Sequence, residues 1–320
     1  MPLILCSIIL FVIIGICRTF KVTYMAQDKL SEFVSNDIEK QKGVSIPVHA
    51  GLLERILVRT TAVSNLHPNA EDEFSMKSVG PSYRIIGEYE KKFRDAMRME
   101  SKVVEEPLTV EKLRPKGYLL LNGHHRWAAA MRCGIKRVPI KIINCATESD
   151  IKKILEKSNH DKRAAIDLDE VVFRPNDYPY LEKKAFSFPL SLRLKKRIRL
   201  GIPALFYYLV KNGYDIWVYA ADYYSIDDIR RFFKAYSVHV DGIITGISKR
   251  DQNKSESMAR MNELIANKYS LNLHIDNETI LETHMKTKEF EDHEINASEE
   301  EWAKKAIAIV EEIEKRAAKK

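Results

Sequence analysis

Residues 164–172 read Ala-Ala-Ile-Asp-Leu-Asp-Glu-Val-Val, an apolar stretch that contains two aspartates spaced two apart. In an extended backbone, residues i and i+2 lie on the same side, so Asp167 and Asp169 can converge on one ligand just beyond the strand. Carboxylate oxygens bind Mg²⁺, and an aspartate can also act as a nucleophile toward phosphorus. An ordinary strand that ends in a loop gives the same pattern, so the surrounding order of elements has to decide.

Strand-like and helix-like segments alternate downstream of this pair. Helical patterns occupy 204–212, 226–234 and 254–268, and strand patterns occupy 215–219, 240–244 and 271–275. Alternation of this kind predicts an α/β fold with a doubly wound parallel (Rossmannoid) sheet, covered by helices on both faces. Ligands of such sheets bind beyond the carboxyl ends of the strands. Asp276 follows the last of these strands, so we expect it at the same edge as Asp167 and Asp169.

The segment from about 160 to 320 resembles the haloacid-dehalogenase-like (HAD-like) superfamily, and residues 193–222 are most similar to its FCP-type phosphatase branch. The resemblance implies a Mg²⁺-dependent phosphohydrolase acting on a phosphorylated small molecule or a phosphoprotein. It implies that Asp167 is the nucleophile, that Asp169 is the general acid and base, and that Asp276 joins both as a metal ligand. It also implies a lysine that steadies the phosphate, which we assign to Lys254, with Lys249 as the alternative.

Two positions depart from the family pattern. Ala220 stands where relatives carry a Thr or Ser that hydrogen-bonds the phosphoryl group, and Asn277 stands where a second aspartate is usual. Each lost donor or charge weakens stabilisation of the transition state. The sequence therefore leaves open a degenerate HAD-like domain without catalysis.

A second motif lies upstream, where the strand-like residues 117–121 run into Asn122 and then Gly123-His124-His125-Arg126. A helical pattern follows from Trp127 to Cys133. Free backbone amides at the start of a helix, together with the helix dipole, attract anions. An arginine adds a bidentate phosphate contact, and a histidine adds a donor or a proton carrier. The arrangement predicts phosphate binding by Gly123, His124, His125 and Arg126.

Residues from about 43 to 147 resemble the ParB/sulfiredoxin-like superfamily, on the strength of residues 107–111, residues 117–143 and the earlier Leu66-His67-Pro68-Asn69. The resemblance implies a small α+β domain that binds phosphate or a nucleotide such as ATP, ADP or CTP. A nucleotide-dependent phosphotransferase is one alternative, in which Glu105, Glu106 or Glu111 is either the base or a surface carboxylate. A sensor that binds phosphoryl ligands without catalysis is another.

Two activities of that superfamily are disfavoured by the residues themselves. Sulfiredoxin-like chemistry needs a cysteine directly before His-Arg, and His124 occupies that position. A DNA-reading helix-turn-helix has no room between Ile143 and the next strand. We therefore expect neither a reductase nor a sequence-specific DNA-binding protein.

The N-terminal residues 3–17 are almost wholly apolar, and Arg18 and Lys21 follow them. Fifteen helical residues span about 22 Å, which is short for a bilayer core of about 30 Å. Basic residues after the apolar stretch favour an uncleaved membrane helix within residues 1–20, with the later domains facing the cytoplasm. The alternative is export followed by cleavage near Gly15 to Cys17.

Composition is consistent with two globular domains, because 45% of the 320 residues are hydrophobic and 30% are charged. The net charge of +7 suits phosphate-bearing ligands, nucleic acid or an anionic membrane and does not choose among them. Four cysteines, two of them in the apolar N-terminal segment, support neither a disulfide framework nor a CxxC metal site.

Overall fold

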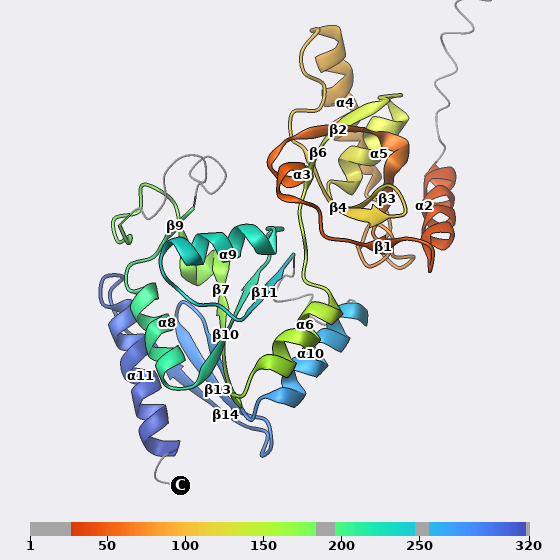
Figure 1. Cartoon of the computed structure of the whole chain (residues 1–320). Helices are drawn as coiled ribbons and strands as arrows, with labels where there is room; N and C mark the ends of the chain where they lie inside the picture. The colour runs from red at the N-terminus through yellow and green to blue at the C-terminus, as the bar shows by residue number, and fades with distance from the viewer. Residues whose placement is uncertain (1–26, 184–195, 247–255, 318–320) are drawn as a thin grey trace, which may run out of the picture. The chain divides into compact units, whose positions relative to one another are not determined.

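The structure is a computed structural model that describes residues 27–183, 196–246 and 256–317. The chain folds into two compact units divided between Ile143 and Asn144 (Figure 1). No helix within the described ranges is long and apolar enough to cross a membrane. The predicted membrane segment 3–17 lies outside those ranges.

The first unit is a mixed sheet with helices packed against it. Its helices and strands are α2 (Gln27–Gln41), β1 (Ile46–Pro47), α3 (Leu52–Ile56), β2 (Arg59–Ala62), the 3₁₀ turn η1 (Val63–Asn65), β3 (Leu66–Pro68), α4 (Tyr83–Arg98), β4 (Leu108–Arg114), β5 (Tyr118–Asn122), α5 (His124–Arg132) and β6 (Arg137–Ile142). The strand order is β2-β6-β4-β5-β3, and β1 pairs with β4. Its core includes Leu30 and Val34 of α2, a helix that precedes the predicted start of this domain at residue 43.

Strand β6 is an interior strand of the sheet, although it contains Pro139 near its start. Pro139 is accommodated because the parallel pairing with β4 begins only at the next residue, Ile140. On its other side Pro139 lies opposite Thr60 of β2. The missing amide of proline therefore falls where the ladder with β4 has not yet begun.

The second unit is an α/β domain. Its elements are α6 (Glu148–Lys157), β7 (Lys162–Asp167), the π-helical turn η2 (Leu168–Val172), β8 (Phe173–Arg174), β9 (Arg197–Ile198), α8 (Ile202–Lys211), β10 (Tyr214–Ala220), α9 (Ile226–Ala235), β11 (Gly242–Thr245), α10 (Glu256–Lys268), β12 (Leu271–Ile275), β13 (Thr279–His284), β14 (Glu289–Glu294) and α11 (Trp302–Ala317). Helix α6, which falls between the two predicted domains, packs against α10 in this unit.

The main sheet of this unit has the order β11-β10-β7-β12-β13-β14. The first four strands are parallel, and β13 and β14 extend the sheet as an antiparallel hairpin. The sheet is therefore mixed, whereas the sequence predicted a wholly parallel one. The sequence of β14 does not predict a strand, because Phe290 is its one apolar residue and no buried face can be recognised from the pattern.

Helices cover both faces of the parallel part of the sheet, as predicted. One face packs against α8, α9 and α11 through a large apolar cluster that includes Ile216 and Val218 of β10. The opposite face, which carries Trp217, packs against Ile151 of α6 and Ile265 of α10. Alternate residues of β10 thus face opposite helical layers. The arrangement leaves the carboxyl ends of β7, β10 and β12 at one edge of the sheet, where the candidate site lies.

Candidate functional site

Asp167 is the last residue of β7, the strand between β10 and β12. Its side chain is largely buried, at 8% exposure, and its Oδ1 accepts a hydrogen bond of 2.8 Å from the backbone amide of Glu170. This contact caps the π-helical turn η2, which turns the chain directly after the strand. The carboxylate is therefore held at the edge of the sheet by the turn that it starts.

Asp169 is fixed by the segment that follows β10. Its Oδ2 accepts hydrogen bonds from the backbone amides of Ala221 and Asp222, at 3.1 and 3.2 Å, and its Oδ1 accepts one of 2.6 Å from the hydroxyl of Tyr224. Burial, and next the hydrogen bond to Asp169, raise the pKa of Tyr224 well above its ordinary value. The hydroxyl thus stays protonated and acts as a permanent donor. No local pattern in the sequence points to Tyr224 as a partner of this carboxylate.

An open pocket of about 510 Å³ lies at the same edge and is lined by Glu170 together with residues 276–279 after β12. Asp276 contributes a carboxylate to this lining, and its Oδ1 accepts a hydrogen bond of 2.6 Å from the amide of Asn277. The pocket therefore joins the turn after β7 to the loop after β12. Every residue that lines the pocket carries a side-chain oxygen, which is the type of ligand that a hard cation such as Mg²⁺ prefers.

Asn277 is an acceptor for two arginines. Its Oδ1 accepts hydrogen bonds from Arg174, at 3.2 Å, and from Arg199, at 2.9 Å. Arg199 is 1% exposed, lies 4.1 Å above the ring of Trp302 and also pairs with Glu299 at 2.5 Å. Burial lowers the pKa of Arg199. The side-chain oxygen of Asn277 thus lies between two cationic groups. Neither Arg174 nor Arg199 was among the predicted site residues.

The structure does not bring all the predicted metal ligands together. Among the described residues, Asp167, Asp169 and Asp276 do not form a group whose ligand atoms lie within 4.8 Å of one another. Ala220 is fully buried at the end of β10. Lys249 and Lys254 lie outside the described residues, so the role assigned to Lys254 stays a prediction.

The first unit forms the predicted strand, glycine turn and helix. Gly123 has φ 99°, in the left-handed region, and a Cβ there would lie 2.5 Å from Leu108 Cδ2 and 3.1 Å from Arg126 Nη2. Only glycine fits this position without strain. Helix α5 begins at the next residue, and the first amides of a helix have no partner within it. The first amides of α5 therefore lie in the same turn as Arg126.

The two histidines connect this helix to the segment between β3 and α4. His124 Nε2 accepts a hydrogen bond of 3.3 Å from the amide of Asn69, and His125 Nε2 accepts one of 3.1 Å from the amide of Ser82. Burial lowers the pKa of His124 to about 4 and lowers that of His125 as well. Both rings are thus neutral at pH 7, and they act here as acceptors.

Arg126 is largely buried, at 13% side-chain exposure, and pairs with Glu106 at 2.8 Å. Its Nη1 also donates to the carbonyl of Glu106 at 3.2 Å. Of the three candidate bases, Glu106 is therefore the partner of the motif, whereas Glu111 is buried and Glu105 lies 4.0 Å from Lys92. An anion at α5 would share Arg126 with an exposed carboxylate.

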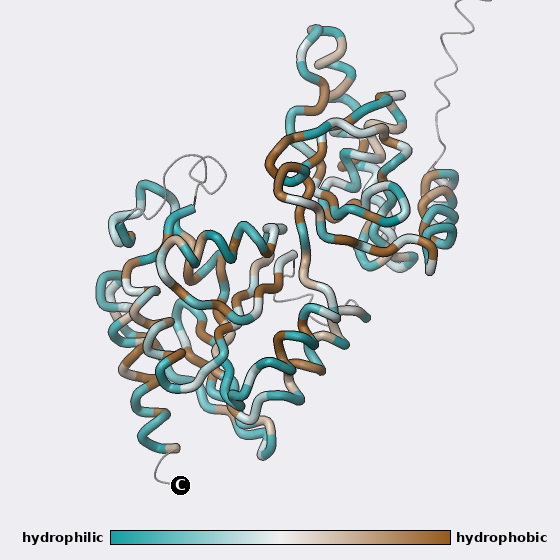
Figure 2. The backbone as a smooth tube through the Cα atoms, viewed as in Figure 1, coloured by the Kyte–Doolittle hydropathy of each residue, from teal (hydrophilic) through white to brown (hydrophobic). Residues whose placement is uncertain are grey.

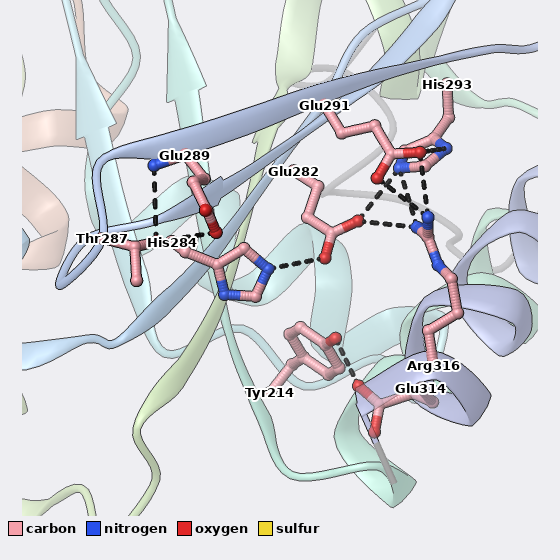
Figure 3. A network of polar contacts seen from close by, with 9 residues as sticks. All are labelled: Tyr214, Glu282, His284, Thr287, Glu289, Glu291, His293, Glu314 and Arg316. Atoms are coloured by element: carbon pink, nitrogen blue, oxygen red, sulfur yellow. Dashed lines mark hydrogen bonds and ion pairs between the residues drawn. The ribbon is translucent and has the colours of Figure 1, made fainter. Parts of the chain in front are cut away.

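A separate polar cluster joins the β13–β14 hairpin to α11 (Figure 3). Glu282, Glu291 and His293 are the one set of potential metal-ligating residues, within the described part of the chain, whose ligand atoms lie within 4.8 Å. The guanidinium of Arg316 donates to both oxygens of Glu291, at 2.8 and 2.9 Å, and to Glu282 at 2.9 Å. His284 Nε2 lies 2.8 Å from the other oxygen of Glu282. Arg316 already neutralises the two carboxylates in the place of a metal ion. The cluster therefore attaches α11 to the β13–β14 hairpin.

Comparison with known proteins identifies one family. Residues 91–159 match the family model described as the ParB N-terminal domain, and the match includes Gly123-His124-His125-Arg126. It begins within α4 and extends through α6, which belongs to the second unit. No curated protein matches the chain by sequence. The chain thus carries a ParB-like module, and a HAD-like assignment for the second unit remains a prediction.

Proposed function

We propose that the second unit is a Mg²⁺-dependent phosphohydrolase of HAD-like type, coupled to a ParB-like unit that binds a nucleotide or another phosphorylated ligand. The observation that carries the proposal is the position of Asp167 and Asp169 at the carboxyl end of β7, inside the parallel order β11-β10-β7-β12. Ligands of open α/β sheets bind at this edge. The adjoining pocket, which Asp276 lines, supports the same location.

The chemistry assigns one role to each carboxylate. An oxygen of Asp167 attacks phosphorus, the bond from phosphorus to the ester oxygen breaks, and Asp169 gives a proton to the leaving oxygen. Water then attacks the aspartyl phosphate and passes a proton to Asp169, which releases inorganic phosphate and restores both side chains. The contacts of Asp169 with Ala221, Asp222 and Tyr224 orient its carboxylate, and because all three partners are donors they suit the step in which Asp169 accepts a proton from water.

Oxygen ligands at this edge fit Mg²⁺. The ion is usually held by one or two carboxylates and keeps several waters, so it does not need all three aspartates within direct reach of one another. Asp167, Asp169 and Asp276 are the side chains that would hold it. Its contribution when bound is to neutralise charge on the phosphoryl oxygens. The openness of the pocket suits a phosphoester carried by a small molecule or by a protein.

The first unit supports a binding role. Its match to the ParB N-terminal domain, the left-handed Gly123 and the buried Arg126 beside the start of α5 all favour a site for phosphate or nucleotide. His124 and His125 hold neighbouring backbone amides, so they shape this site more than they offer a proton. A nucleotide-dependent phosphotransferase in this unit, with an accessory second unit, is the second candidate, and the family match is compatible with its ligand-binding part.

The test is phosphate release from a general phosphoester in the presence of Mg²⁺, together with nucleotide turnover. The chain lacking residues 1–20 is compared with Asp167→Asn, Arg126→Ala and the matched control Asp292→Asn, whose residue is exposed on β14. We expect Asp167→Asn to abolish release and Asp292→Asn to leave it unchanged. Nucleotide turnover that disappears only with Arg126→Ala would instead support the phosphotransferase. No turnover by the unmutated chain would support a non-catalytic sensor.

A further inference from the structure

Helix α3 of the first unit has its polarity inverted relative to an ordinary surface helix. Leu52, Leu53, Ile56 and Leu57 are 41%, 72%, 42% and 55% exposed, whereas Arg55 is only 5% exposed. Ile56 lies three and four residues after Leu53 and Leu52, which places these three side chains on one side of the helix, and Leu57 follows as the C-cap with extended backbone. Figure 2 shows the hydrophobic colour along this part of the tube. With Val58, which is 65% exposed, these five residues form what we call the aliphatic patch.

The charged residues of α3 are fully engaged on its inner side. Arg55 Nε donates to the carbonyl of Ala50 at 3.2 Å. Glu54 accepts a hydrogen bond of 3.0 Å from the amide of Gly51 through one oxygen and pairs with Lys112 at 2.7 Å through the other. These contacts fix the orientation of the helix, so the patch cannot turn inward without breaking them. A contiguous patch of exposed aliphatic side chains is typical of a surface that binds a protein or a membrane.

The surroundings of the patch are basic. Helix α3 packs against β6, and β6 pairs with β2, the strand that follows the patch. These two strands contribute exposed Arg59, Arg137 and Lys141, and neither contains an acidic residue. An aliphatic surface with a basic rim is the pattern of peripheral docking on anionic lipid, where apolar side chains insert and cations meet the headgroups.

We propose that the aliphatic patch docks on an anionic lipid bilayer. A second copy of the chain is a poorer occupant, because a symmetric contact would bring two basic rims together.

The test uses the full chain with one added tryptophan as a local depth probe. The native Trp127, Trp217 and Trp302 are at most 2% exposed, so they contribute a constant background. Leu53→Trp reports on the patch, and Tyr207→Trp, at a position 72% exposed on α8, is the matched control. Each variant is mixed with vesicles of phosphatidylcholine and phosphatidylglycerol, or of phosphatidylcholine alone, made with plain or brominated acyl chains.

We expect the emission of Leu53→Trp to shift to the blue and to be quenched by brominated chains in the phosphatidylglycerol vesicles, with no change for Tyr207→Trp. Adding Arg59→Gln and Lys141→Gln to Leu53→Trp should lower the ratio of docked to undocked protein about fivefold for each charge removed. Unchanged emission of Leu53→Trp on mixing with vesicles would overturn the proposal. Blue-shifted emission of Leu53→Trp in the absence of vesicles would also overturn it. A shift that grows with protein concentration would indicate that a second copy covers the patch. A shift independent of concentration would indicate that the chain itself covers it.

Discussion

We expect acidification to destabilise the first unit through one buried side chain, His124. Burial lowers its pKa from 6.5 to about 4, and the side chain is 4% exposed. The unfolded chain therefore binds a proton at a pH where the folded chain does not. The contribution of neutral His124 to the free energy of unfolding is fully present above pH 6.5 and is lost as the pH falls toward 4. Linkage over this interval gives a loss of about 2 kcal/mol at pH 5 and about 3 kcal/mol below pH 4.

The assay is amide hydrogen exchange in a urea series at pH 7 and pH 5, read by mass spectrometry on peptides that cover α5 and β6. Peptide resolution separates the first unit from the second. The matched variant is His124→Gln, which keeps an acceptor for the amide of Asn69 and cannot titrate. His125 also has a lowered pKa and is present in both proteins, so the comparison removes its own titration and leaves only its repulsion of a protonated His124.

The native chain should lose about 2 kcal/mol more than His124→Gln between pH 7 and pH 5, although the variant starts from a lower stability at pH 7. The same pH dependence in both proteins would refute the reasoning. It would mean that His124 is accessible to protons in the folded chain, and that its contact with Asn69 does not require the neutral ring.

Three further predictions concern the second unit and are measured by urea unfolding followed in its own peptides. Gly201→Ala should cost about 1–3 kcal/mol, because φ is 83° and an added Cβ would overlap α11; wild-type stability would show that α8 and α11 pack less tightly than described. Tyr224→Phe should cost about 1.5–3 kcal/mol, since it removes a hydroxyl that donates to a carboxylate, whereas Tyr207→Phe at an exposed position should be neutral. Arg316→Met should cost about 1–3 kcal/mol and should recover in part when Glu282→Gln removes the charge left behind; strict additivity in this double-mutant cycle would disprove the coupling (Figure 3).

Local patterns were sufficient for most elements but not for the contacts between them. The strand predicted at 215–219 and the helix predicted at 226–234 lie inside β10 and α9, because apolar spacing and end residues are properties of short segments. The arginines that bind Asn277 come from 78 and 103 residues away. Such pairs depend on how strands are ordered in the sheet, which a single sequence does not encode in any local pattern.

The orientation of α3 shows a second limit. Leu52, Leu53 and Ile56 have the spacing of one helical face, and an apolar face of this kind is ordinarily buried. The structure exposes them, because Arg55 and Glu54 find backbone and lysine partners on the inner side. Periodicity identifies an apolar face, but it does not identify what covers that face.

The two departures from the HAD-like pattern have different structural consequences. Asn277 is matched by its surroundings, since it serves as an acceptor for Arg174 and Arg199, and a carboxylate there would pair with the same two cations. Ala220 has no such compensation, because it is buried and the next two backbone amides donate to Asp169. A phosphoryl group at this edge would therefore compete with Asp169 for those amides. We therefore expect the proposed turnover to depend on how readily Asp169 releases these two amides.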